Sequence, residues 1–213
     1  MKIVVFGASG GTGQHLVQQG LAQGYLVTAF GRSPEAILAA PAPGFSLVKG
    51  DVHDAESVSA AIAGQDAVLS ALGARTLGRS DVLETGVRNI LAGMESHRVN
   101  RIIVLGAAGA SEDATRHQGV VRRLSLKFVI SVFLREPFRS QREQERLLQA
   151  SSVDYTIVRP PRLLNIPGAG HYRVQEDGLP PAGTTISRAD VADFMIRQLA
   201  NSTWIRKGPY LAA

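Results

Sequence analysis

Three glycines follow the first apolar run of this chain at intervals of three residues. Gly7, Gly10 and Gly13 come directly after "KIVVF" at residues 2–6. One glycine permits a tight turn at a strand end, one lets backbone approach a bulky ligand, and one lets a helix pack closely on a sheet. The spacing therefore predicts a strand, a turn and a helix.

The turn can serve packing alone, or it can bind a phosphate group. The N–H groups of a first helical turn and the helix dipole attract phosphate, and the hydroxyl groups of Ser9 and Thr12 can add hydrogen bonds. Because a strand–helix–strand pattern of the right length follows, we favour a dinucleotide-binding turn.

Short apolar runs alternate with amphipathic segments along the rest of the chain. The pattern is typical of a doubly wound parallel sheet of the Rossmann-like α/β class, and we predict a single domain over residues 1–213. The "SRAD" stretch at 187–190 is typical of a capping box that opens a last helix. Strands are expected at 2–6, 26–30, 45–49, 66–72, 101–106 and 154–159, and helices at 12–22, 54–63, 80–98 and 137–150.

Composition excludes several classes of function. The chain has no cysteine, which rules out disulfides and thiolate chemistry and fits a reducing, cytoplasmic environment; no metal site is expected. Its apolar runs are too short for a membrane span. The net charge of +5 favours anionic ligands, but no basic run or zinc finger indicates nucleic-acid binding.

The end of the second expected strand indicates which dinucleotide binds. The stretch "TAFGRSPE" places Arg32 and Ser33 where an acidic residue would accept hydrogen bonds from a ribose hydroxyl group. A planar cation beside a hydroxyl group matches a 2′-phosphate instead, although Arg32 can also be an ordinary loop arginine. We therefore predict NADPH as the cofactor.

Two more strand ends are expected at the same edge of the sheet. Asp51 and Val52 follow the third strand, where an aspartate can accept from the adenine amino group or simply cap a turn. Leu72 and Gly73 follow the fourth strand, beside the expected path of the cofactor.

Several stretches together resemble one family, the atypical short-chain dehydrogenases/reductases of the NAD(P)H-binding, NmrA-like type that include flavin reductase (biliverdin-IXβ reductase). The resemblance runs through nearly the whole chain, in order. The stretches are "GASGGTG", "VTAFGRSPE", "KGDV", "GQDAVLSALG", "GVRNILAGMESHRVNRIIVL" and "YTIVRPPRL".

The resemblance implies a Rossmann-like fold, NADPH binding and hydride transfer to flavins or linear tetrapyrroles. It also implies that two further stretches border the nicotinamide: Gly106 with Ala107, and the turn Pro160, Pro161 and Arg162. The implied cofactor-binding residues are Gly7, Ser9, Gly10, Gly11, Thr12, Gly13, Arg32, Ser33, Asp51, Val52, Leu72, Gly73, Gly106, Ala107, Pro160 and Pro161.

The chain departs from the family at its reaction centre. None of its tyrosines has a lysine four residues later, so the usual Tyr-x-x-x-Lys proton relay is absent. Ala107 stands where many relatives have serine, and Arg162 stands where flavin reductase has a histidine. The missing proton relay argues against alcohol oxidation and sugar-nucleotide epimerisation, and the other two changes alter polar groups near the family's reaction centre.

Two functions remain open. A reductase of flavins, quinones or similar conjugated acceptors needs mainly ring positioning and a cation, for which Arg162, Arg159 or Arg75 are candidates. Arg159 can equally make an ordinary salt bridge. The flavin would be a substrate rather than a bound group. The alternative is a non-enzymatic NADP(H)-binding redox sensor of the NmrA-like type.

The partner of the reaction is expected to be a small molecule, with no nucleic acid and no membrane involved. Residues 107–136 and 162–185 should shape the acceptor pocket. The apolar and basic segment 120–138 can pack on the sheet, close as a lid or dock a partner. Whether the protein is a monomer or a homodimer is left open by the sequence.

Overall fold

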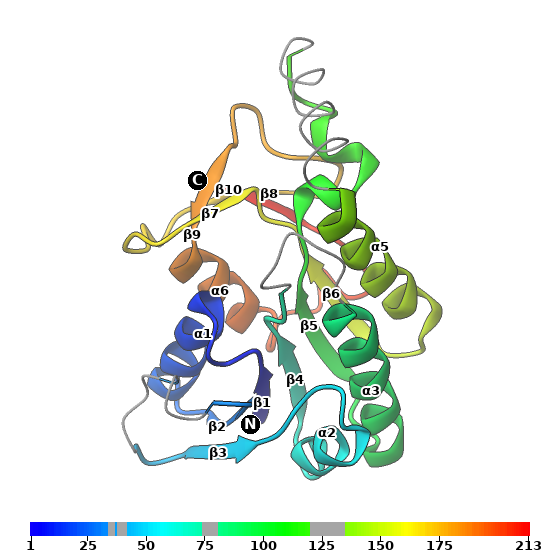
Figure 1. The fold of residues 1–213 in the computed structure, drawn as a ribbon. Coiled ribbons are helices and arrows are strands. Elements are labelled where there is room, and N and C mark those ends of the chain that lie inside the picture. Colours follow the sequence, from blue (N-terminus) through cyan, green and yellow to red (C-terminus); the bar gives the residue numbers. More distant parts are fainter. Residues whose placement is uncertain (34–36, 38–41, 74–80, 120–134) are drawn as a thin grey trace.

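Six parallel strands form the central sheet of the protein, in the order β3-β2-β1-β4-β5-β6 (Figure 1). The computed structural model describes residues 1–33, 37, 42–73, 81–119 and 135–213. The predicted Rossmann-like fold is confirmed. The strands are β1 (Lys2–Phe6), β2 (Leu26–Gly31), β3 (Phe45–Lys49), β4 (Ala67–Ser70), β5 (Arg101–Leu105) and β6 (Asp154–Val158).

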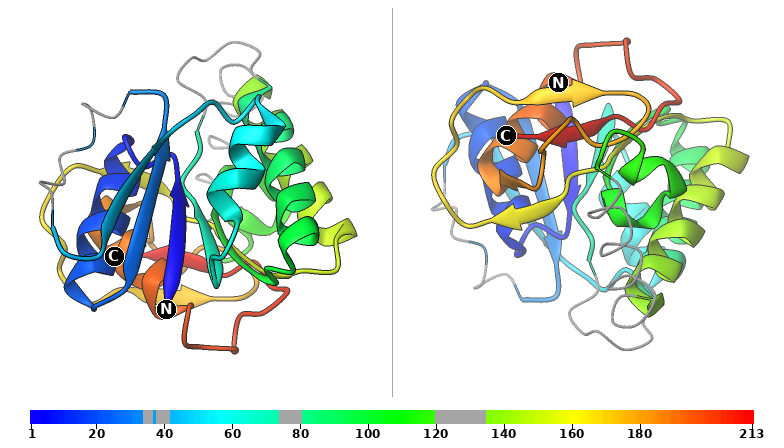
Figure 2. Two further views of the ribbon diagram at one scale, coloured as in Figure 1. Left: turned by 90° about the horizontal axis from the view of Figure 1, so that it is seen from below. Right: turned by 90° about the horizontal axis from the view of Figure 1, so that it is seen from above.

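Helices cover both faces of this sheet, as Figure 2 shows. On one face, α1 (Gly11–Ala22) packs with α6 (Arg188–Arg197). On the other, α3 (Val82–His97) lies between α2 (Ala55–Ile62) and α5 (Arg135–Ala150). Each expected helix is therefore present, with ends that differ by a few residues.

The alternation of side chains along β1 explains why both faces need a helical layer. Ile3 and Val5 point into the cluster shared with α1 and α6, whereas Val4 and Phe6 point into the cluster shared with α2 and α3. All four side chains are completely buried. A parallel strand covered on both faces is apolar at every position, which is the pattern that the sequence displayed.

The strand order reverses beside β1, and this reversal positions the site. The chain runs outward from β1 through β2 to β3, and then returns to place β4 on the other side of β1. In open α/β sheets the loops diverge at such a point, and ligands bind in the crevice at the carboxyl ends of the strands.

A smaller layer of short elements lies beyond the sheet. Residues 162–185 contribute to it, but its strands have only three residues each and carry no periodic signal in the sequence. The elements are β7 (Arg162–Leu164), paired with β9 (Thr185–Ser187); β8 (Arg173–Gln175), paired with β10 (Tyr210–Ala212); and the 3-10 turns η2 (Ala108–Ala110) and η3 (Glu112–Thr115).

No helix among the described residues combines the length and the apolar character that a membrane crossing requires.

Candidate functional site

The glycine-rich turn between β1 and α1 has the backbone that the spacing predicted. Gly7 has φ of +77°, and a Cβ at this residue would collide with the backbone of Ala71 at the end of β4. The Gly10 N–H donates to the Gly7 carbonyl oxygen at 2.9 Å and closes the turn. A Cβ at Gly13 would overlap this same carbonyl, so the start of α1 lies directly against the turn.

No side chain caps the N–H groups in the first turn of α1. The N-cap residue is Gly10, whose position carries no side-chain hydrogen bond, and the first turn contains no acidic residue. A helix start of this kind is electropositive and has free donors, which suits a phosphate group.

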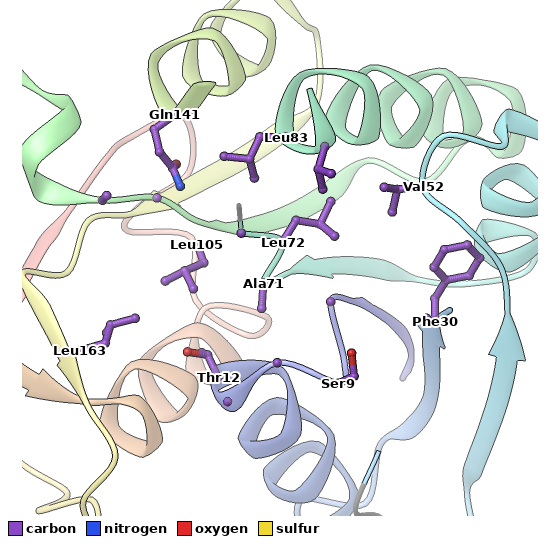
Figure 3. Close-up of a pocket in the computed structure, with 18 of the residues that line it drawn as sticks. Ser9, Thr12, Phe30, Val52, Ala71, Leu72, Leu83, Leu105, Gln141 and Leu163 are labelled. Atoms are coloured by element: carbon purple, nitrogen blue, oxygen red, sulfur yellow. The ribbon is translucent and has the colours of Figure 1, made fainter. Parts of the chain in front are cut away.

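A cavity of about 700 Å³ runs along the carboxyl ends of the strands, in front of this turn (Figure 3). Its volume falls within the range of small-molecule and cofactor sites. Many of the predicted cofactor residues line it together: Gly7, Ser9, Gly10, Gly11, Thr12, Arg32, Asp51, Val52, Leu72, Gly73, Gly106 and Ala107.

Other predicted residues do not line the cavity. Gly13 is buried behind the turn, and Ser33 lies just after β2. The Pro160 carbonyl accepts from the N–H of Ala108 at 2.9 Å, so this proline and Pro161 shape the backbone behind the end of β5. Arg162 is exposed at the start of β7.

A charged cluster closes the β2–β3 end of the cavity. Arg32 Nη1 lies 3.9 Å from Asp51 Oδ2, and both side chains are well exposed, at 55% and 40%. His53 bridges Asp51 and Asp81, with its ring nitrogens 2.8 and 3.2 Å from their carboxylate oxygens. Asp54 does not join this cluster, because its side chain caps α2.

Hydrogen bonds within the cluster shift the pKa values of its members. The bond to Asp51, and then the bond to Asp81, raise the pKa of His53 above its usual value. The backbone N–H of His53, and then its ring, lower the pKa of Asp51. The carboxylate of Asp51 thus stays charged beside Arg32.

Arg188 is a cavity residue that was not predicted from the sequence. It opens α6, and its guanidinium donates to Asn165 Oδ1 at 2.7 Å and to the Thr12 hydroxyl group at 3.4 Å. It therefore stands against the glycine-rich turn although it lies far along the chain. The sequence signalled this residue only as part of the "SRAD" capping box, in which the Ser187 hydroxyl indeed accepts from the N–H of Asp190.

The opposite end of the cavity is apolar. Leu83, Leu105 and Leu163 line the cavity away from the charged cluster, and Leu72 lies between them and Val52 (Figure 3). Gly106 and Ala107 also line the cavity. Gln141 on α5 adds an uncharged polar side chain, and Phe138 lies on the same helix. Among the described residues that line this end, none has a side chain that titrates near neutral pH.

Arg159 makes the salt bridge that was one of its two expected roles. Its guanidinium donates twice to Glu145 of α5, at 2.6 and 3.2 Å, and once to the Gly208 carbonyl at 3.1 Å. Both side chains of the pair are nearly buried, and Arg159 does not line the cavity. Arg75 and most of segment 120–138 lie outside the described residues.

Comparison with known proteins gives a family for the chain. A family model described as NAD(P)H-binding matches residues 7–202. The 2-alkyl-3-oxoalkanoate reductase of Stenotrophomonas maltophilia is 28% identical over 220 residues, which is 92% of this chain and 64% of that protein. The chain thus spans less than two thirds of this relative.

Solved structures share the fold over the full length. A Veillonella parvula short-chain dehydrogenase/reductase in complex with NADP has a TM-score of 0.79 at 21% identity, covering 100% of this chain and 94% of the other. ChuY, an anaerobillin reductase from Escherichia coli O157:H7, has a TM-score of 0.78 at 24% identity, covering 100% and 97%. The glycine-rich turn, the uncapped start of α1 and the volume of the cavity all fit a nicotinamide dinucleotide.

Proposed function

The chain belongs to the NAD(P)H-binding family, and we propose that it binds NADPH and reduces a flavin, a quinone or a similar conjugated acceptor. Such a cofactor supplies a hydride when it is bound. The residues of this chain hold it, orient it and exclude water from the reacting end.

The cofactor's groups have partners along the cavity. The pyrophosphate would lie at the start of α1, within reach of the Thr12 hydroxyl group and the Arg188 guanidinium. The 2′-phosphate would lie at Arg32, whose contact with Asp51 is long and exposed and therefore easily exchanged for a dianion. The preference for NADPH over NADH rests on this arginine.

The lack of a titratable side chain among the described residues of the apolar end is the observation that supports a conjugated acceptor. The described side chains of this end are leucines, an alanine, a phenylalanine and a glutamine, and none of these exchanges a proton near neutral pH. Ketone reduction normally needs a proton donor at the oxygen. A conjugated acceptor can take two electrons and a proton as hydride, spread the negative charge over its rings, and receive a second proton from solvent once it leaves the slot.

The reduction of an acceptor of this class depends on ring placement more than on acid–base chemistry. An apolar slot holds two flat rings close together and keeps water away from them, and proximity alone can lower such a barrier substantially. The leucines that line this end of the cavity would provide this slot.

Two measurements test the proposal. Calorimetric titration with NADPH and NADH should give binding of both, tighter for NADPH. Loss of NADPH absorbance with menadione or FMN should then be faster with the protein than without it. If NADPH binds but no acceptor is turned over, the non-enzymatic redox sensor is the better description; if neither nucleotide binds, both functions are excluded.

A further inference from the structure

Gln141 and Gln144 form a short hydrogen-bonded chain on α5 beside the end of β5. The Gln144 side chain is completely buried, and its amide nitrogen lies 3.2 Å from the Leu105 carbonyl oxygen and 3.1 Å from the Gln141 amide oxygen. Gln141 lines the cavity, and Figure 3 shows its side chain reaching from α5 toward β5.

The Leu105 carbonyl determines how both amides are turned. A backbone carbonyl can only accept, so the atom of Gln144 that faces it must be the nitrogen. This same nitrogen contacts Gln141, and two amide nitrogens cannot share a hydrogen bond as donors. The Gln141 atom at this contact is therefore the oxygen, and the NH₂ group of Gln141 is the end left for a ligand.

The result is a neutral NH₂ donor at the apolar end of the cavity. The Gln141 oxygen accepts a hydrogen bond from Gln144. The two N–H bonds of Gln141 are left to donate to an acceptor atom on the ligand. The other described residues that line this end are leucines, a glycine, an alanine and a phenylalanine, and none of their side chains donates a hydrogen bond. Apolar surroundings strengthen such a hydrogen bond.

We propose that the NH₂ group of Gln141 donates to a ring carbonyl oxygen of the acceptor, the oxygen that gains negative charge when the ring is reduced. This role rests on the proposed reductase function and makes the substrate class more specific, namely a conjugated ring that carries a carbonyl group. Gln144 is a positioning residue, because it acts only by orienting Gln141.

The position of Gln141 assigns it to the acceptor rather than to the cofactor. The residues expected to hold the dinucleotide come from the strand ends, from the start of α1 and, in the case of Arg188, from the start of α6. Gln141 and Phe138 instead project from α5, and Leu163 projects from β7; these elements form the wall of the cavity beyond Gly106 and Ala107.

A pair of ligands isolates this hydrogen bond in a binding experiment. Menadione carries two ring carbonyl groups, and 2-methylnaphthalene has the same rings without oxygen. In protein saturated with NADP⁺, Gln141→Leu should weaken menadione binding by about five- to ten-fold, the usual effect of one lost hydrogen bond. Binding of 2-methylnaphthalene should be unchanged or slightly tighter, because leucine is apolar.

A matched control lies on the same helix. Gln149 is exposed, and Gln149→Leu should leave all affinities unchanged. Equal losses for both aromatic ligands would overturn the proposal, since they would indicate a changed pocket shape. So would a Gln141→Leu variant whose NADPH affinity falls as much as its menadione affinity, because the amide would then serve the cofactor. A wild-type protein that binds no NADPH would instead refute the proposed function.

Discussion

Arg32 and Arg188 bring positive charge to two different parts of the cavity. Arg32 is exposed and its contact with Asp51 is 3.9 Å long, so its side chain is only weakly held. Arg188 is held by Asn165, a neutral partner, and stands beside the electropositive start of α1. A cation is unfavourable at a helix start unless an anion lies between them. We therefore expect each arginine to recognise its own phosphate group.

The first prediction concerns selectivity between the two nucleotides. Arg32→Asp should weaken NADPH binding by about 10- to 100-fold, because charge-assisted hydrogen bonds to the 2′-phosphate are lost and repulsion replaces them. NADH has no 2′-phosphate and should bind as before or more tightly. Calorimetry with both nucleotides measures the ratio. Arg142→Asp, at an exposed site on α5, is the control. An unchanged ratio in the Arg32 variant would remove this arginine from the site.

The second prediction concerns the pyrophosphate. Arg188→Gln should weaken NADPH and NADH equally, by about 10-fold, because both contain this group. Binding of 2′-AMP, which lacks a pyrophosphate, should not change. The experiment is a competition titration with all three ligands, and Arg197→Gln on the same helix is the control. If 2′-AMP binding falls in parallel, Arg188 supports the fold of the site rather than the pyrophosphate.

The loop between β3 and α2 takes part in a network of charged side chains that also includes residues of neighbouring elements. His53 links Asp51, on its own loop, to Asp81 at the start of α3, and Asp51 in turn faces Arg32 at the end of β2. Three elements are thus connected by exposed groups. Exposed ion pairs contribute little individually and are screened by salt.

The third prediction is a pH dependence of stability at this loop. The pKa of His53 is higher in the folded state than its ordinary value of 6.5. The stability that His53 contributes is therefore fully present below pH 6.5 and is lost as the pH rises through the pKa of the folded state. The melting temperature of His53→Gln should therefore fall below that of wild type at pH 5.5, and the difference should shrink by pH 8. A difference that stays constant with pH would mean that packing, not charge, is lost.

The architecture of the whole molecule depends on contacts between distant parts of the chain. Arg159 follows β6 and joins Glu145 of α5 to the carbonyl group of Gly208, while its guanidinium lies 5.3 Å from the ring of Tyr210 in β10. This buried pair connects the central sheet, a covering helix and the C-terminal layer. Removing one partner leaves an uncompensated charge in a nearly buried position.

The fourth prediction follows from this buried pair. Glu145→Ala should lower the free energy of unfolding by about 3 kcal/mol, as expected when one member of a buried ion pair is removed. The exposed pair of Arg146 and Glu143 on the same helix is the control, and Glu143→Gln should cost less than about 1 kcal/mol. Urea unfolding measures both. Equal effects of the two substitutions would mean that the Glu145 contact adds no more to the free energy of unfolding than a surface ion pair does.

Strands, helices and the glycine-rich turn were predictable because their signals are local. Burial on both faces makes a strand apolar throughout, a capping box needs four successive residues, and Gly7 reports a backbone conformation that other residues avoid. The family resemblance extended these local signals to Gly106 and Ala107. The short strands β7 to β10 had no comparable signal, because three residues are too few to establish a period.

The sequence by itself determined the class of fold, the position of the turn and the strand ends that meet along the cavity. Only the tertiary structure decided that Arg188 reaches Thr12, that Gln144 turns the amide of Gln141, and that Arg159 is engaged by Glu145. In each of these contacts, the packing of helices and strands determines which side chains meet. The residues next to a side chain in the sequence do not reveal that packing. Arg188 and Thr12, 176 residues apart, become neighbours only because α1 and α6 cover the same face of the sheet.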